Sequence, residues 1–437
     1  MDPQPTEVPM AKQVGNVWSR WGWAEPAVWT ERMLTALEQG VKGGVWFSLI
    51  DKVYSAGNLT AATRKVAANR GAPGVDHVTV EQFTLQANAN VGKLGEQLRQ
   101  GSYQPQAIRR VYLPKPGSTE KRPLGIPTVR DRVAQAAVVH VLEPIFERDF
   151  APTSYGFRPG RGCQQALARV EELLAAGYCY VVDADLKSYF DTIPHERLLQ
   201  RLQAKVGDGR VLRLIESFLK AGILDGLQEW TPEAGAPQGA VLSPLLSNVY
   251  LDPLDHQMAA RGFEMVRYAD DLVILCRTKA EAERALEELQ AWVVANDLKL
   301  HPTKTRIVEA STEAFDFLGY RYDRGYRFVR AKSLEKLKET VRTKTKRTDG
   351  RSLPCIIADL NQTLRGWFGY FKRCHATVFS GLDGWIRRRL RSVLRKRTKR
   401  KGISRHGADE KRWPVAYFTK QGLFSLKAAH GKLVSPL

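Results

Sequence analysis

Two adjacent aspartates, Asp270 and Asp271, stand between apolar segments in the stretch RYADDLVILC (267–276). The apolar residues around them predict a strand, a tight turn and a second strand over residues 263–276. Aspartate is also a common turn former, because its side chain bonds nearby backbone groups. The pair alone therefore leaves open whether these carboxylates do chemistry or only shape the turn.

A third carboxylate ends another apolar strand. The stretch YCYVVDADL (178–186) predicts a buried strand that reaches Asp185. If the strands are neighbours in one sheet, Asp185 and Asp270 converge at one edge, where a cation would relieve their repulsion. Oxygen ligands without nearby Cys or His favour magnesium over zinc. Two such ions about 3.5–4 Å apart activate a 3′-hydroxyl and stabilise a leaving pyrophosphate, which is phosphoryl transfer.

Three ordered blocks carry a resemblance to the reverse transcriptases. YADD (268–271) resembles their tyrosine–x–aspartate–aspartate signature, and DLKSYF (185–190) resembles their first catalytic block. APQGAVLSPLLSNVYLDPLD (236–255) resembles the proline–glutamine–glycine block that lines the nucleotide pocket. Further stretches resemble the reverse transcriptase–maturases encoded within bacterial group II introns, in the form that lacks the nuclease domain. These stretches are RPLGIPTVRDRVAQ (122–135), SYGFRPGRG (154–162), FLGY (317–320) and RGWFGYF (365–371).

The resemblance implies an α+β fold, namely a right-hand polymerase followed by an all-helical domain. Fingers and palm, with an antiparallel palm sheet, are expected at 76–328. The thumb, or maturase domain, is expected at 329–400, and a short basic DNA-binding tail at 401–437. Residues 1–75 form an N-terminal extension. Its tryptophans predict either a small folded cap or a stacking surface; they are Trp18, Trp21, Trp23 and Trp29.

The resemblance also implies roles for single residues. The expected catalytic residues are Asp185, Asp270 and Asp271, which together with Leu186 would hold two Mg²⁺ ions. Phe190 is expected beneath the sugar of the incoming nucleotide, where its ring would collide with a 2′-hydroxyl and favour dNTPs. A buried core ring is the alternative for Phe190. The other residues expected at the nucleotide are Lys115, Arg122 (or Lys121 in its place), Gln238, Gly239 and Lys304, the last also explained as a surface lysine.

The charge balance indicates a polyanionic partner. The 437 residues include 67 Lys and Arg against 46 Asp and Glu, a formal net charge of +21. Nucleic acid is the first expectation and an anionic membrane the second. The longest apolar run, from Val133, is about half a membrane span. Neither a secretory signal nor paired cysteines are apparent, so a reducing bacterial cytoplasm is expected.

Basic residues in two places are expected to contact nucleic acid through its phosphates. One place is the loop 154–162, and the other is a helix with a run of one charge sign over 387–401. Phe317, Leu318 and Gly319 would grip the primer end, with a plain strand core as the alternative. The basic candidates are Arg158, Arg161, Arg387, Arg388, Arg391, Arg395, Lys396 and Arg397.

These observations favour an RNA-directed DNA polymerase that binds its group II intron RNA, promotes splicing and moves the intron by target-primed reverse transcription. Its partners would be intron RNA, an RNA template with a DNA primer, target DNA and dNTPs. One alternative is a domesticated enzyme of the same fold in DNA repair or phage defence, which a catalytic RNA beside the gene would distinguish. Another is a splicing-only RNA-binding maturase, against which the intact aspartates argue.

Overall fold

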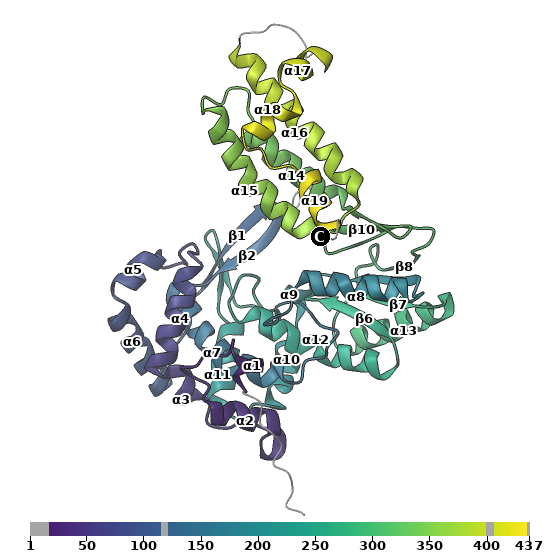
Figure 1. Cartoon of the computed structure of the whole chain (residues 1–437). Coiled ribbons are helices and arrows are strands. Elements are labelled where there is room, and N and C mark those ends of the chain that lie inside the picture. The colour runs from purple at the N-terminus through teal and green to yellow at the C-terminus, as the bar shows by residue number, and fades with distance from the viewer. Residues whose placement is uncertain (1–16, 115–120, 399–405, 435–437) are drawn as a thin grey trace, which may run out of the picture.

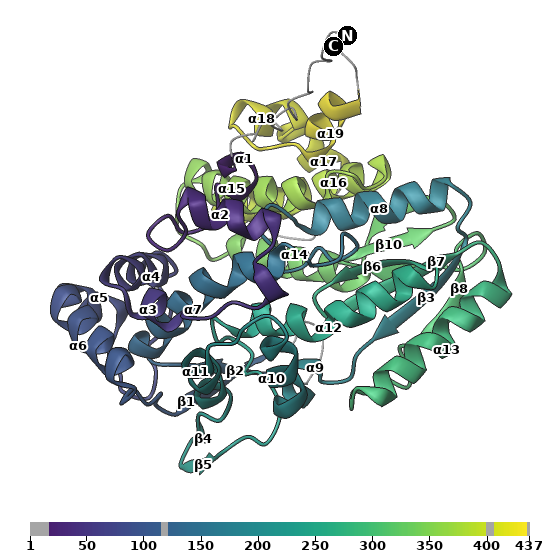
Figure 2. The same cartoon turned by 90° about the horizontal axis from the view of Figure 1, so that it is seen from below.

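The computed structural model describes residues 17–114, 121–398 and 406–434. Figure 1 shows N-terminal helices and a hairpin at one side, a larger sheet with its covering helices at the other, and C-terminal helices above both. The view from below in Figure 2 shows the same separation, with α13 lying along the outer side of the larger sheet.

The N-terminal part is helical and surrounds a long buried helix, α7 (Val129–Glu147). Trp21 and Trp29 are buried, and Nε1 of Trp29 donates a hydrogen bond to the carbonyl oxygen of His140 in α7 (2.9 Å). The cap interpretation is therefore confirmed for these two rings. The surrounding helices are α1 (Trp18–Trp21), α2 (Glu31–Gln39), η1 (Lys42–Gly44), α3 (Ile50–Tyr54), α4 (Ala56–Ala68), α5 (Val80–Leu85) and α6 (Ala87–Gln100).

A four-stranded sheet of order β2-β1-β4-β5 forms the fingers. The prolines between residues 103 and 130 predict short strands, and an antiparallel hairpin forms there. A distant segment adds β4 parallel to β1, which the sequence did not predict, because three-residue strands leave no periodic pattern. The strands are β1 (Ile108–Pro114), β2 (Lys121–Ile126), β4 (Ile223–Asp225) and β5 (Gln228–Trp230).

The palm is a four-stranded antiparallel sheet of order β6-β7-β3-β8. Alternate residues of β3 face opposite sides: Val182 joins the core with α12 and α13, whereas Val181 joins the core with α8 and the C-terminal helices. The elements are β3 (Tyr180–Asp185), β6 (Glu264–Tyr268), β7 (Asp271–Cys276), β8 (Arg306–Glu309), α8 (Cys163–Ala175), α12 (Ser243–Ala260) and α13 (Lys279–Ala295).

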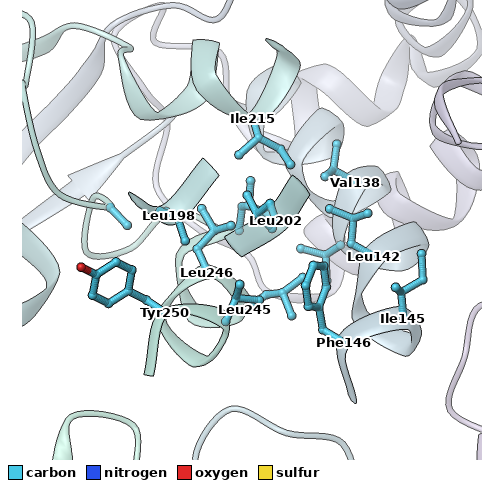
Figure 3. Packing of buried hydrophobic residues seen from close by; sticks show 14 of the residues in the cluster. Val138, Leu142, Ile145, Phe146, Leu198, Leu202, Ile215, Leu245, Leu246 and Tyr250 are labelled. Carbon is cyan, nitrogen blue, oxygen red and sulfur yellow. The ribbon is translucent and has the colours of Figure 1, made fainter. Parts of the chain in front are cut away.

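A continuous apolar core joins fingers to palm. Figure 3 shows Leu142 and Phe146 of α7 beside Leu202 and Leu245, which come from α10 and α12. Because α7 packs on one side of this core and α12 on the other, the fingers hairpin and the palm sheet share a common support. The remaining helices here are α9 (Tyr189–Thr192), α10 (His195–Gln203) and α11 (Gly209–Leu219).

The chain then makes a small sheet and continues, in its described part, only as helices. The sheet consists of β9 (Phe315–Phe317), β10 (Tyr320–Asp323) and β11 (Tyr326–Val329). Trp413, Phe418 and Leu426 of the C-terminal segment are buried in one core with the thumb helices. The helices are α14 (Ala331–Lys344), α15 (Leu353–Phe371), α16 (Ala376–Arg397), α17 (His406–Arg412), α18 (Val415–Lys420) and α19 (Leu426–Val434).

This architecture confirms the expected α+β fold with fingers, an antiparallel palm and an all-helical thumb. The domain limits at 76, 329 and 401 stay predictions, although β11 ends at Val329 and α14 begins at Ala331. None of the helices in the described ranges combines the length and apolarity that crossing a membrane requires.

Candidate active site

The palm sheet brings three carboxylates to one edge. In the antiparallel pairing of β3 with β7, Asp185 is directly opposite Asp271. Directly opposite residues project from the same face of a sheet, so these two side chains are neighbours. Asp270 occupies the two-residue turn between β6 and β7, because Tyr268 pairs with Asp271. The convergence expected from the sequence is therefore present.

The turn that carries Asp270 is held from beneath by a buried arginine that the sequence analysis did not single out. Arg267 is fully buried and its Nε donates to the carboxylate of Asp255 (2.7 Å). Its Nη1 donates to Oδ1 of Asn248 (3.0 Å) and to the carbonyl oxygen of Ala269 (3.0 Å). Ala269 needs this support, since its φ of 58° lies in the left-handed region that side chains disfavour.

The three carboxylates repel one another, which is the chemistry that a cation relieves. Burial, followed by repulsion from Asp185, raises the pKa of Asp270, while Arg122 acts in the opposite direction. Burial by the surrounding chain, then Asp270 and Asp185, raises the pKa of Asp271 to about 6, although its side chain keeps a solvent-exposed edge. A set of hard oxygen donors, among which Asp270 and Asp271 have raised pKa values, fits a divalent cation.

One of the three carboxylates is paired with a lysine. Within the residues that the structure describes, no three His, Cys, Asp or Glu side chains are grouped as a metal-binding set. Instead Nζ of Lys304 lies 2.5 Å from Oδ2 of Asp185. Lys304, expected at a phosphate, thus satisfies a carboxylate of the site itself.

Two residues expected at the nucleotide, Gln238 and Gly239, pack against the fingers hairpin. The backbone nitrogen of Gly125 in β2 donates to the carbonyl oxygen of Gln238 (2.7 Å). Gly239 has a φ of 104°, and a Cβ there would overlap the carbonyl oxygen of Gly125. The proline–glutamine–glycine turn is therefore seated on the strand that carries Arg122. Lys115 lies outside the described residues.

Phe190 lies at the margin of the apolar core. It is half-buried, and it lines a cavity of about 420 Å³ together with Trp230 and Pro237. Its carbonyl oxygen accepts a hydrogen bond from the backbone nitrogen of Ala236 (2.7 Å), which ties it to the nucleotide block. The place of Phe190 beneath the sugar of the nucleotide stays a prediction.

The interpretation of Arg158 as a nucleic-acid contact is wrong, because its guanidinium is used inside the protein. Arg158 is buried and forms an ion pair with Glu147 (2.8 Å). Its Nη1 also donates to the carbonyl oxygens of Ala151 (2.6 Å) and Ser154 (2.8 Å). Its neighbour Arg161 is half-buried, with Nη1 donating to the carbonyl oxygen of Pro152 (2.7 Å).

The basic run of α16 divides into buried and exposed members. Arg391 and Arg395 are buried and pair with Glu410 (3.3 Å) and Asp409 (3.0 Å) of α17, so their assignment to nucleic acid is wrong. The basic run contains no acidic residue of its own. The fold places two acidic residues from later in the chain, Asp409 and Glu410, beside it. Nucleic-acid contact stays a prediction for Arg387, which is half-buried, and for the exposed Arg388, Lys396 and Arg397.

The expected primer grip lies at the junction of palm and thumb. Phe317 is buried in the core of β9, whereas Leu318 and Gly319 form the turn to β10. The hydroxyl of Tyr370 in α15 donates to the carbonyl oxygen of Leu318 (2.8 Å). Leu186, expected at the metal, has a buried side chain and forms a β-bridge with Leu300. Any contact of Leu186 with a metal ion would therefore be made by its backbone.

An antiparallel palm with clustered aspartates, a fingers hairpin and a helical thumb defines a reverse transcriptase. Residues 113–322 match the family of reverse transcriptases (RNA-dependent DNA polymerases), and residues 334–413 match the group II intron maturase-specific domain. The chain belongs to the group II intron-encoded reverse transcriptase–maturases, and its class of activity is RNA-directed DNA polymerase.

The chain is also similar to individual proteins. Over 305 residues the chain is 35% identical to Protein YkfC of Escherichia coli K12, covering 60% of this chain and 79% of YkfC. Over 196 residues it is 39% identical to the group II intron-encoded protein LtrA of Lactococcus lactis subsp. cremoris, covering 44% of this chain and 32% of LtrA. A solved partial Cas6-RT-Cas1–Cas2 complex is 27% identical, with a TM-score of 0.37 and coverage of 56% of this chain and 42% of that one.

Proposed function

We propose that this protein copies RNA into DNA by joining dNTPs to the 3′-hydroxyl of a primer, with two Mg²⁺ ions held by Asp185, Asp270, Asp271 and the backbone of Leu186. The observation that carries the proposal is the register that sets Asp185 opposite Asp271, with Asp270 in the adjoining turn. When bound, such ions activate the attacking hydroxyl and stabilise the leaving pyrophosphate.

The protein's own groups position the reactants. Arg122 would hold the triphosphate, since a guanidinium grips phosphate oxygens in pairs. Its influence on the pKa of Asp270 supports this place near the reacting phosphate. Phe190 would lie beneath the sugar and exclude a 2′-hydroxyl. Lys304 would leave Asp185 and neutralise the departing phosphate, which its exposed side chain leaves it free to do.

The C-terminal helices are proposed to bind the intron RNA. The maturase domain and the reverse transcriptase domain support binding of intron RNA and of RNA templates. We infer that the bound group II intron is helped to splice and is then copied at a nicked target DNA in the bacterial cytoplasm. Phosphate contacts by exposed Arg388, Lys396 and Arg397 would hold the RNA without reading its sequence.

A primer-extension assay tests the proposed chemistry. Purified protein with an RNA template, an annealed DNA primer, dNTPs and Mg²⁺ is expected to lengthen the primer. Asp270→Asn keeps the size of the side chain and removes its charge, so extension should fall by at least about a hundredfold while template binding persists. Extension by the variant at the wild-type rate would refute the proposed metal site.

A further inference from the structure

The loop SYGFRPGRG is built against the catalytic turn. The backbone nitrogen of Tyr155 donates to the carbonyl oxygen of Arg267 (2.9 Å), and the backbone nitrogen of Arg267 donates to the carbonyl oxygen of Thr153 (3.0 Å). The loop thereby extends the edge of the palm sheet beside β6. Arg158 is the buried anchor of this loop.

The residue before Phe157 fixes how closely the loop approaches the turn. A Cβ on Gly156 would overlap the backbone nitrogen of Ala269, so only glycine fits there. Nδ2 of Asn248 donates to the carbonyl oxygen of Gly156 (2.8 Å), and the same Asn248 accepts from Arg267. One buried network therefore holds both the loop and the turn that carries Asp270.

Phe157 has both a strained backbone conformation and an exposed aromatic ring. Its φ is 57°, in the left-handed region, and its side chain is 45% exposed. A strained backbone and an exposed aromatic ring both cost free energy, and such costs concentrate at functional sites. The ring contacts two other aromatic rings, one of them Tyr268 of the catalytic turn, with centroids 6.5 Å apart and ring planes at 45°.

The ring of Phe157 meets the residue proposed beneath the sugar. Its centroid lies 6.4 Å from that of Phe190, with the ring planes at 73°. On another side Phe190 meets the buried ring of Tyr189 (5.4 Å, 65°). Tyr189 is fixed by its own hydroxyl, which donates to the carbonyl oxygen of Ser247 (2.8 Å). Phe190 is therefore held between an immobile inner ring and the exposed ring of Phe157.

We propose that Phe157 is a positioning residue for sugar selection. By packing edge-on against Phe190, it keeps that ring where a 2′-hydroxyl would collide with it. The inference rests on the proposed role of Phe190 and deepens it. Without the Phe157 ring, Phe190 gains room to tilt away, and ribonucleotides are accepted more readily.

The test compares kcat/KM for a dNTP with kcat/KM for the matching rNTP in primer extension on an RNA template. For Phe157→Ala the dNTP preference should fall about three- to tenfold, the size expected from losing one ring–ring contact. Phe157→Tyr keeps the ring and should keep the preference. Because a loss of folded enzyme lowers both values equally, the ratio responds only to selection.

A matched control and a double variant complete the test. Tyr326→Ala removes another exposed ring with an edge-on partner, His375, and should leave the preference unchanged. In a Phe190→Ala background, Phe157→Ala should have no further effect, since its partner is gone.

Two results would overturn the inference: an unchanged preference in Phe157→Ala, or an equal loss in the Phe190→Ala background. A wild-type protein that extends no primer with either nucleotide would instead overturn the proposed function.

Discussion

Lys304 was expected at the nucleotide, but it forms an ion pair with the expected metal ligand Asp185. The ion pair is partly exposed, with the Lys304 side chain 60% and the Asp185 side chain 25% accessible. Exposed pairs contribute about 0.2–1 kcal/mol, so this lysine is a weak competitor for a carboxylate that a divalent ion also needs.

Removing that competitor should strengthen metal binding. Lys304→Gln is expected to bind Mg²⁺ about two- to fivefold more tightly than the wild type, in proportion to the small free energy of the ion pair. Calorimetric titration of the protein without nucleotide measures this directly. Equal affinities would mean that Lys304 already leaves Asp185 free in solution.

Glu143 in α7 is a titratable residue for which the proposed function has no use. Burial raises its pKa to about 7, against an opposing effect of Lys65 and a reinforcing one of Glu147. It lines a small cavity with Glu25 and His140, and burial lowers the pKa of His140 to about 4. Between pH 4.5 and 7 the folded protein holds a proton on Glu143 that the unfolded chain has lost, so stability falls as the pH rises.

Glu143→Gln should remove this pH dependence. At pH 5 wild type and variant should unfold at similar urea concentrations, whereas at pH 8 the variant should be more stable, by about 1–3 kcal/mol for a shift of this size. His140 is present in both proteins, so its titration cancels from the comparison. A wild type that is the more stable at pH 8 would show that Glu143 is charged and satisfied.

At the scale of elements, two arginines of equal charge have opposite roles because of what packs against them. Arg158 holds the loop between α7 and α8 through a buried pair with Glu147, whereas Arg388 on α16 is exposed. Removing one partner of a buried pair costs about 3–5 kcal/mol, while an exposed cation contributes mainly to binding of a polyanion.

The two alanine variants should therefore separate stability from binding. Arg158→Ala is expected to lower the unfolding temperature and leave the salt dependence of RNA binding unchanged. Arg388→Ala should keep the unfolding temperature and reduce the slope of log affinity against log salt by roughly one. Filter binding over a salt series and thermal unfolding measure both quantities. The reverse pattern would restore Arg158 as a phosphate contact.

At the scale of the whole molecule, the C-terminal segment is part of the thumb rather than an appendage. Asp383 of α16 is buried and accepts hydrogen bonds from the hydroxyl of Ser425 (2.7 Å) and the backbone nitrogen of Leu426 (3.0 Å). These bonds begin α19 and fix its position on α16, as the contact between the two helices in Figure 1 shows. DNA held by this segment would thus be held rigidly relative to the thumb.

Breaking that connection should free the segment without unfolding the palm. Asp383→Ala leaves buried donors without an acceptor, and we expect faster proteolytic cleavage within residues 406–434. Glu335→Ala, which removes an exposed pair with Arg342, serves as the control and should be cleaved at the wild-type rate. Limited proteolysis followed by mass spectrometry locates the cuts. Equal cleavage of both variants would show that apolar contacts alone hold the segment.

Local pattern and residue order determined much of this protein. The strands at 178–186 and 263–276, which bring the aspartates to their ends, follow from periodicity over short segments, and the all-helical domain from residue 329 follows from the resemblance. The family follows from the order of its blocks. Such features are set by neighbours in sequence, and the fold does not alter them.

Only the tertiary structure decided which basic side chains are paired inside the protein and which aromatic rings contact one another. Arg158, Arg391 and Arg395 look like phosphate contacts until the fold brings Glu147, Asp409 and Glu410 against them. The exposed Lys304 gains Asp185 as a partner only when its segment lies beside the end of β3, and Phe157 gains a partner only when its loop joins β6. Charge neutralisation and ring packing act over a few ångströms in space, and sequence distance does not report that separation.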